Sequence, residues 1–354
     1  MKAILKQPLN ALLIFLPIAF VAELAHFSPV IVFVAAALTV VPLSGLLGDA
    51  TEELAGRTGP KIGALINATL GNAAELIITV LAVQRGLLDL VRASIVGSII
   101  GNILLVLGGA FLVGGLKNGT QKFSPSDAGL NATMLVMAAL VLTVPSFFAF
   151  AIEPDKARVE ELSLLTAGVI IVLYILSVIY TLRAKRGDPL AREAAHEPEI
   201  SLATAVGLLA VSTVLIAVMS EFLVGAVEPM TKQLGISELF VGIILVPIIG
   251  NIAEHVVAID VALKDNMDLS LGIAVGSSLQ VALLVAPVLV FVARLFGQYL
   301  TLEFSSFELI ALLAACFVAA AVSVDGRSNW LEGALLIGLY LIVGIAFFFL
   351  PVKV

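Results

Sequence analysis

Two glutamates stand deep inside strongly apolar stretches of the sequence. Glu75 lies in GNAAELIITVLAV and Glu254 lies in VPIIGNIAEHVVAI. A carboxylate at the centre of a bilayer costs at least ~2.5–3.5 kcal/mol on insertion scales, so it normally faces the protein interior, with a partner or a pathway. Two carboxylates that face each other at low dielectric repel, which favours protonating at least one of them. A divalent cation bound between them would remove that repulsion directly.

The residues beside both glutamates supply further oxygen ligands. Asn72 and Asn251 each stand three residues before a glutamate, on the same face of a helix. Gly71 and Gly250, with Pro247 one turn before the second motif, would loosen the helix and free backbone carbonyls to bind an ion. Carboxylate, amide and carbonyl oxygens suit Ca²⁺, whereas softer metals prefer thiolate or imidazole. The sequence therefore predicts a metal site made by these residues.

Other polar residues are expected along the same ion path. The stretches that follow the two motifs carry small polar positions with a predicted lining role: Ser98, Asn102, Ser277 and Gln280. His255 could be a cation ligand, a proton acceptor or a hydrogen-bonded packing residue, and the last two interpretations are preferred. Glu52 and Glu228 could cap an ion entrance, although ordinary placement at a helix end is the preferred interpretation.

The composition identifies the class of protein. Of the 354 residues, 60% are hydrophobic and 13% are charged, whereas soluble domains are roughly 45–50% apolar and about 25% charged. The chain is therefore an integral membrane protein, and apolar runs of about 20 residues exclude a transmembrane β-barrel. A net charge of −7 argues against nucleic-acid binding. The single cysteine, Cys316, excludes a disulfide within the chain and a cysteine-based metal cluster.

Hydropathy predicts an all-α polytopic fold with eleven transmembrane helices. The expected helices cover roughly residues 9–26, 29–48, 61–83, 89–116, 127–151, 161–182, 202–227, 236–263, 269–296, 305–324 and 330–351. With this count, twelve of the 19 lysines and arginines fall on the N-terminal side of the membrane. The positive-inside rule then places the N-terminus in the cytoplasm and the C-terminus outside. The compact N-terminus suits the cell (inner) membrane of a prokaryote.

The sequence contains an internal repeat. Glu75 and Glu254 are 179 positions apart, and the same spacing joins Asn72 to Asn251 and Ser98 to Ser277. Equivalent helices are five apart, and because five is odd, they cross the membrane in opposite directions. Such inverted repeats are a transporter architecture, with the substrate site near the midplane where the repeats meet. Small-xxx-small patterns at Gly97–Gly101 and Gly272–Gly276 are interpreted as close helix packing.

The repeat predicts the domain organisation. An extra N-terminal helix is expected in residues 1–28, a first five-helix repeat in 29–183, a short charged cytoplasmic linker in 184–200, and a second, inverted repeat in 201–354. The linker is interpreted mainly as a solvated connector.

Four motifs carry a resemblance to a known family. GNAAEL (Gly71–Leu76) and GNIAEH (Gly250–His255), with GSIIGN (Gly97–Asn102) and GSSLQ (Gly276–Gln280), resemble the Ca²⁺/H⁺ antiporter (cation/proton exchanger) family of the calcium/cation antiporter superfamily. The resemblance covers nearly the whole chain. It implies eleven helices in two inverted halves, with Ca²⁺ exchanged for H⁺ and no cofactor. The family often has an acidic linker, but here the linker is short and mixed in charge.

By motif match, the cation-binding glutamates of the family fall on Glu75 and Glu254. Its asparagines fall on Asn72 and Asn251, and its supporting polar residues on Ser98, Asn102, Ser277 and Gln280. The predicted function is a secondary active antiporter that works by alternating access, in which Ca²⁺ and H⁺ compete for the carboxylate pair. The alternatives are a Na⁺/Ca²⁺ exchanger and, less favoured, a passive cation channel. No nucleophile–base pair or phosphate loop indicates an enzyme.

Overall fold

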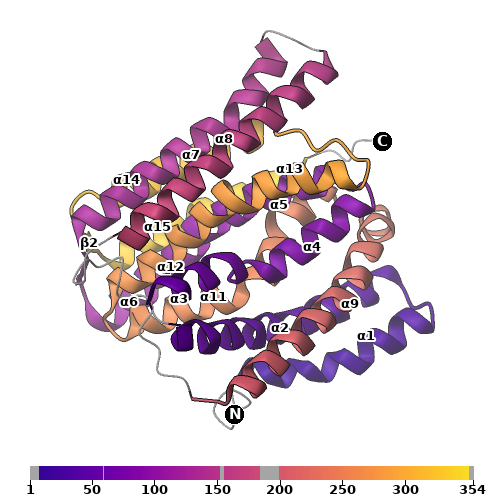
Figure 1. The fold of residues 1–354 in the computed structure, drawn as a ribbon, viewed down its shortest axis with the longest axis horizontal. Helices are drawn as coiled ribbons and strands as arrows, with labels where there is room; N and C mark the ends of the chain where they lie inside the picture. The colour runs from indigo at the N-terminus through magenta and orange to yellow at the C-terminus, as the bar shows by residue number, and fades with distance from the viewer. Residues whose placement is uncertain (1–7, 59, 152–154, 184–198, 351–354) are drawn as a thin grey trace.

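The protein folds as a bundle of long helices. The structure, a computed structural model, describes residues 8–58, 60–151, 155–183 and 199–350. In Figure 1, α1, α2 and α9 run along the lower side of the bundle and α7, α8 and α14 along the upper side, with α3, α4, α11 and α12 between them. The predicted linker lies largely outside the described residues, because it spans 184–200.

The first half of the chain contains the earlier glutamate motif. Its elements are the 3₁₀ segment η2 (Pro8–Ile14), α1 (Phe15–Leu24), α2 (Pro29–Thr58), α3 (Pro60–Leu70), α4 (Ala73–Gln84), α5 (Leu88–Ile100), the π-helical η3 (Gly101–Leu107), α6 (Gly108–Asn118), β1 (Gln121–Lys122), α7 (Pro125–Ala151) and α8 (Lys156–Arg183).

The second half contains the later motif. Its elements are α9 (Leu202–Leu234), α10 (Glu238–Phe240), the π-helical η5 (Val241–Leu245), α11 (Val246–Leu263), α12 (Met267–Gln280), the π-helical η6 (Val281–Val285), α13 (Ala286–Leu295), α14 (Ser306–Val322), β2 (Arg327–Ser328) and α15 (Trp330–Phe348). The short strands β1 and β2 pair antiparallel and join the two halves at one end of the bundle.

The helices agree closely with the predicted spans. Among the described residues, 8 helices are long and apolar enough to cross a membrane. Three shorter apolar helices, Leu9–Leu24, Ala73–Gln84 and Ser306–Val322, fall on the remaining predicted spans. The count of eleven transmembrane helices stays a prediction. Two predicted ends were wrong: α2 continues past residue 48 to Thr58, and α9 continues past residue 227 to Leu234.

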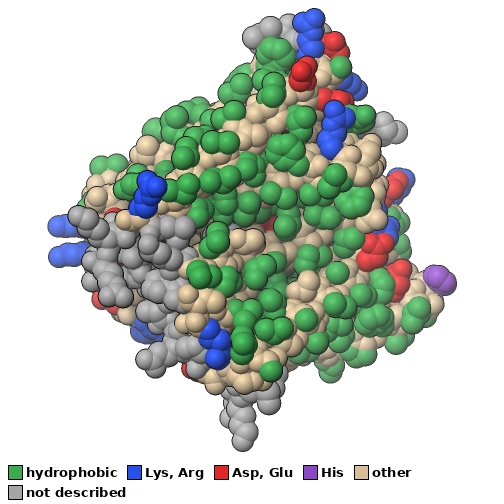
Figure 2. Space-filling view, in the orientation of Figure 1, with side chains coloured by type: hydrophobic (Ala, Val, Ile, Leu, Met, Phe, Trp, Pro, Cys, Tyr) green, Lys and Arg blue, Asp and Glu red, His purple; other side chains and the backbone are tan. Residues whose placement is uncertain are grey.

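The outer surface is apolar. Many large hydrophobic side chains on α8 and α15 are exposed, including Leu165, Val169, Leu335 and Ile342. Figure 2 shows hydrophobic side chains over most of the visible helical surface, with charged side chains gathered toward its edges. Lipid tails cover such a surface at low cost, whereas water does not.

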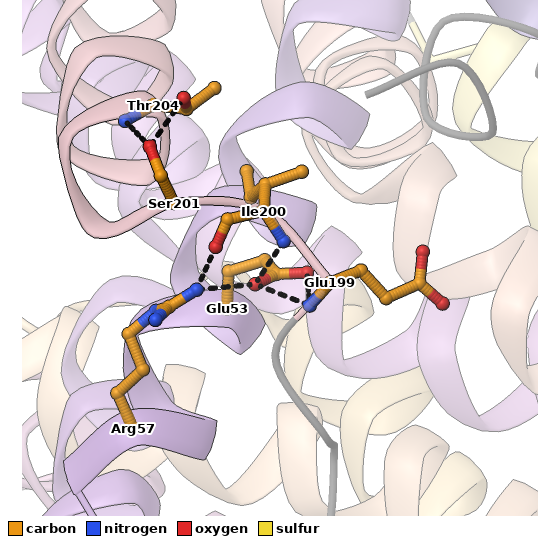
Figure 3. A network of polar contacts seen from close by, with 6 residues as sticks. All are labelled: Glu53, Arg57, Glu199, Ile200, Ser201 and Thr204. Carbon is orange, nitrogen blue, oxygen red and sulfur yellow. Dashed lines mark hydrogen bonds and ion pairs between the residues drawn. The ribbon is translucent and has the colours of Figure 1, made fainter.

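A buried carboxylate joins α2 to the start of α9. Glu53 is 2% exposed, and its oxygens accept hydrogen bonds from the backbone N–H groups of Glu199, at 2.9 Å, and of Ile200, at 3.3 Å. Arg57 forms an ion pair with Glu53 at 3.5 Å and donates to the Ile200 carbonyl. These contacts surround a single carboxylate (Figure 3). They fix the chain just before Ser201, whose hydroxyl accepts from the Thr204 N–H and caps α9.

Replacement of Glu53 by alanine should destabilise the protein. The substitution leaves two backbone N–H groups without their acceptor, which costs about 2–3 kcal/mol. The measurement is the thermal unfolding midpoint of the detergent-purified variant, which should fall clearly. Glu303→Ala removes an exposed carboxylate elsewhere in the chain and serves as the control, with a change within ~0.5 kcal/mol. Equal midpoints for the two variants would show that the buried carboxylate does not hold these segments together.

Candidate functional site

A helix break positions the first glutamate. α3 ends at Leu70 and α4 begins at Ala73, so Gly71 and Asn72 lie between two helices. The Gly71 N–H still bonds the Asn67 carbonyl at 2.8 Å, and a new helix then starts. Loosening of the helix at Gly71, as the sequence predicts, is therefore present. Glu75 lies in the first turn of α4, where the helix dipole favours a negative charge.

The second motif has a different backbone. α11 passes through Gly250 and Asn251 without interruption, so the predicted loosening at Gly250 is not found. The irregular backbone lies earlier, in the π-helical η5 that ends just before Pro247. A proline lacks the N–H that a helix interior needs but is tolerated in a first turn, so the change from η5 to α11 accommodates it. The two copies of one motif thus adopt two backbone conformations.

Each glutamate packs on the glycine of the opposite half. A Cβ at Gly71 would lie 3.6 Å from Glu254 Oε1 and 3.6 Å from Gln280 Oε1. A Cβ at Gly250 would lie 3.6 Å from Glu75 Cβ. Because neither glycine has a side chain, both motifs approach closely at the centre of the bundle. The reciprocal arrangement is what a two-fold relation between the halves produces.

Asparagine and serine side chains link the halves in the same reciprocal way. Ser98 donates a hydrogen bond to Glu75 Oε1 and accepts one from Asn251 Nδ2 at 3.3 Å. At the equivalent position, Ser277 donates to Asn72 Oδ1 at 3.4 Å. Each motif asparagine therefore contacts the serine of the other half.

A second set of contacts has no counterpart in the repeat. Asn72 Nδ2 donates to Gln280 Oε1 at 2.6 Å, and Asn102 Nδ2 donates to the Ser277 hydroxyl at 3.0 Å. His255 Nε2 lies 3.3 Å from Asn102 Oδ1. Gln280 and Asn102 are not repeat equivalents, since position 101 is Gly and position 281 is Val. The structure thus gathers the following predicted residues into one cluster: Gly71, Asn72, Glu75, Ser98, Asn102, Gly250, Asn251, Glu254, His255, Ser277 and Gln280.

Two carboxylate oxygens in this cluster are unsatisfied. Within the described part of the chain, the buried Oε2 atoms of Glu75 and Glu254 have no hydrogen-bond partner. A buried polar atom without a partner is costly, and a carboxylate more so. A hard cation or protons would satisfy both atoms. No group of three or more His, Cys, Asp or Glu side chains that could hold a metal occurs among the described residues, so a cation in this cluster would need neutral oxygens beside the two carboxylates.

The two predicted entrance residues lie on the surface, and their role at an ion entrance stays a prediction. Glu52 and Glu228 are both exposed, and Glu228 forms an ion pair at 2.6 Å with Lys232 of its own helix. Both helices extend past these glutamates, so neither residue is at a helix end as predicted.

An interhelical ion pair was not predicted. Arg85, at the end of α4, pairs with Glu221 of α9. Gly225, one turn further along α9, leaves room for the guanidinium, since a Cβ there would lie 3.0 Å from its nitrogen. The repeat offered a signal, because Glu221 aligns with Gly45 and so breaks the symmetry of the two blocks.

Apolar helices around a central cluster of two carboxylates with amides and hydroxyls define a class: polytopic membrane proteins with a buried polar centre. The chain matches the sodium/calcium exchanger protein family over residues 28–183 and 204–349, and it belongs to that family. The all-α membrane fold class is thereby confirmed.

Two sequence relatives match almost end to end. The chain is 41% identical to the Ca(2+)/H(+) antiporter of Aphanothece halophytica, with 96% of each chain covered. It is 40% identical to the Ca(2+)/H(+) antiporter ChaA of Bacillus subtilis, with 94% of this chain and 96% of that protein covered.

Solved structures share the fold. Native YfkE matches with a TM-score of 0.86 and 37% identity, covering 97% of this chain and 100% of that one. The H+/Ca2+ exchanger CAX has a TM-score of 0.71 at 17% identity, covering 96% of this chain and 91% of that one, and it shows the fold alone.

Ser98→Ala should weaken divalent-cation binding. The hydroxyl orients the Glu75 carboxylate, and a hydrogen bond to a charged group is worth about 1.5–3 kcal/mol, so the dissociation constant for Ca²⁺ should rise at least about tenfold. Isothermal titration of the detergent-purified protein measures it. Ser94→Ala, one turn earlier on α5, is the control, because the buried Ser94 hydroxyl has no partner in the described part of the chain. Equal affinities for both variants would contradict a role for Ser98.

Proposed function

We propose that this protein is a secondary active antiporter that exchanges Ca²⁺ for H⁺ by alternating access. The observation that carries the proposal is the pair of buried, unsatisfied carboxylate oxygens on Glu75 and Glu254, which come from equivalent positions of the two halves. Relatives at about 40% identity over nearly the whole chain carry the name Ca(2+)/H(+) antiporter, which supports the same assignment.

Competition for one site couples the two ions. Ca²⁺ binds between the deprotonated carboxylates, with neutral oxygens of Asn72 and Gln280 nearby. Protons that arrive from the other side neutralise the same carboxylates and release the cation. Bound Ca²⁺ and bound protons each remove the repulsion between the two carboxylates. Without either ion, the doubly charged site is unfavourable at low dielectric. Exchange therefore needs no separate coupling device, and the substrates are the two ions alone, with neither a chemical reaction nor a cofactor.

The conformation of the bundle supports alternating access. Gly97 and Gly242 lie where α5 crosses η5: a Cβ at Gly97 would lie 2.3 Å from the Ile243 carbonyl oxygen, and one at Gly242 would lie 2.5 Å from Ala93 Cβ. The equivalent residues are Gly276 and Gly63. A Cβ at Gly276 would meet no atom within 4 Å, and Gly63 packs against Ala55 of α2. One crossing is thus tight and its counterpart is open.

We infer that this is one of two access states. The site is closed on the α5–η5 side and reached from the α3 side, which agrees with the exposure of the two glutamates: Glu75 is 1% exposed, while Glu254 is partly exposed. In the other state α3 packs against α12, and Gly63 and Gly276 form the tight crossing. The halves that exchange conformations are those proposed from the sequence, residues 29–183 and 201–354.

The membrane and orientation are part of the proposal. Bacterial and cyanobacterial relatives favour the cell membrane. The distribution of lysines and arginines favours a cytoplasmic N-terminus and an external C-terminus. With this orientation, the open α3 side faces the cytoplasm.

A Na⁺/Ca²⁺ exchanger is the second candidate, since the family description includes it. The sodium exchangers that the motifs also resemble usually add an acid on the helix after the second motif. In α12 the site-facing end is Ser277–Gln280, without a carboxylate. Asp268, in the first turn, accepts a hydrogen bond at 2.6 Å from the backbone N–H of Ser124 instead. Fewer negative ligands favour protons over several Na⁺ ions.

In liposomes, Ca²⁺ uptake should depend on a pH gradient. With an acidic lumen and no Na⁺, the purified protein should accumulate external Ca²⁺, and both Glu75→Gln and Glu254→Gln should abolish uptake. Asp260→Asn makes the same chemical change on α11 at an exposed residue paired with Lys264, and it should leave uptake intact. Uptake that requires a Na⁺ gradient would favour the second candidate. Uptake that survives both glutamate substitutions would place the site elsewhere.

Gly276→Ala should slow transport without loss of stability. The open crossing accommodates the methyl group, but the opposite access state would not. Gly97→Ala should instead destabilise the protein by at least about 1–3 kcal/mol, because its methyl group would meet backbone atoms in this state. Thermal unfolding and initial uptake rates measure the two effects. An initial uptake rate of Gly276→Ala equal to that of the wild type would contradict the inferred exchange of the two helix crossings.

A further inference from the structure

His255 is the polar residue that most clearly breaks the repeat. Its equivalent is Leu76, so the first half has no imidazole beside its glutamate. The His255 ring is 7% exposed and contacts Asn102. A buried imidazole at this position needs an explanation that the symmetric carboxylate pair does not supply.

The hydrogen bonds of Asn102 define the role of the ring. Its Nδ2 group donates to the Ser277 hydroxyl, so its Oδ1 atom faces His255 Nε2. An amide oxygen only accepts, and therefore Nε2 carries the hydrogen in this arrangement.

The same direction continues through the site. Ser277, which accepts from Asn102, donates its own hydrogen to Asn72 Oδ1, and Asn72 Nδ2 donates to Gln280 Oε1. Every donor in this chain points away from His255. Amides and hydroxyls can reverse together, so the chain has two possible directions. A histidine tautomer with its hydrogen on Nε2 favours the observed direction, because that hydrogen bonds Asn102 Oδ1.

The direction decides which atom Gln280 presents. Gln280 Oε1 and Glu254 Oε1 both lie 3.6 Å from the position of a Cβ at Gly71, so the amide oxygen and the carboxylate oxygen face the same glycine. In the reversed chain, Gln280 would donate to Asn72 and place its NH₂ group there. An NH₂ group repels a cation and would bind the carboxylate itself, whereas an oxygen is a ligand that Ca²⁺ accepts.

We propose that His255 is a positioning residue for cation binding: its Nε2–H group orients Asn102, and through Ser277 and Asn72 it keeps the oxygen of Gln280 toward the carboxylate pair. This inference rests on the proposed function. It assigns His255 neither a bond to the ion nor a share in carrying protons.

Four variants test the proposal. His255→Leu introduces the residue of the other half, and His255→Gln keeps an N–H donor close to the position of Nε2. Asn102→Val introduces the residue found at position 281, and the fourth variant combines it with His255→Leu. The readouts are the Ca²⁺ dissociation constant in detergent, the KM and maximal rate of uptake in liposomes, and the thermal unfolding midpoint.

The loss of one hydrogen bond should raise the dissociation constant and the KM of His255→Leu about three- to tenfold, with little change in maximal rate. His255→Gln should restore most of the affinity. Because His255 acts through Asn102, His255→Leu should add nothing to Asn102→Val.

Three results would overturn the proposal. Additive effects of the two substitutions would show that His255 acts independently of Asn102. Equal losses in His255→Gln and His255→Leu would show that the N–H donor is irrelevant. A lower unfolding midpoint of His255→Leu with an unchanged affinity for Ca²⁺ would show that the ring contributes only to packing.

These experiments distinguish a failure of the proposed function from a failure of the role proposed for His255. Uptake without a pH gradient would contradict proton exchange, whereas the binding measurements in detergent would still test the role of His255. Glu254→Gln, measured beside these variants, shows that the binding signal comes from the carboxylate site.

Discussion

The structure depends on one electrostatic constraint: two carboxylates meet near the centre of an apolar bundle, each with an unsatisfied oxygen. Their mutual repulsion at low dielectric makes the empty, doubly charged site unfavourable. The surrounding sequence follows from the need to hold them there. Gly71 and Gly250 let the motifs approach, and Ser98 and Ser277 tie each half to the asparagine of the other. The close packing of the central helices keeps lipid away from groups that it cannot solvate.

Duplication supplies the pair of carboxylates, but the halves are not conformationally equal. The chain breaks between α3 and α4 at Gly71, whereas α11 is continuous at Gly250. The crossing at Gly97 is tight, while its equivalent at Gly276 is open. Two nearly identical sequence motifs therefore have two stable backbone arrangements. Such a pair satisfies the physical requirement for alternating access, because an exchange of arrangements moves the opening without moving the site.

The sequence predicted the membrane helices and the two central glutamates, because burial in a membrane imposes a strong pattern of apolar residues. Apolar runs located the helices, and the cost of a buried charge singled out Glu75 and Glu254. It did not predict which motif would break, since Gly71–Asn72 and Gly250–Asn251 are identical, and Pro247, the sequence difference next to them, precedes the motif that stays continuous. Glu53 escaped notice because its acceptor role depends on backbone N–H groups at Glu199 and Ile200, about 146 residues away. Side-chain pattern carries no information on such backbone partners.

The residues that break the symmetry suggest how a site with two symmetric carboxylates can discriminate between cations. Glu75 and Glu254 alone would attract any cation of suitable size. In the proposed mechanism, Gln280 adds an amide whose effect depends on its orientation: the oxygen attracts a cation and the NH₂ group repels it. Asn102 helps to set that orientation through Ser277 and Asn72. A proton needs no such shell, because it bonds a carboxylate oxygen directly. In the proposed exchange, the amides therefore adjust the affinity for Ca²⁺ while the carboxylates set the affinity for protons, so that one shared site would serve both ions.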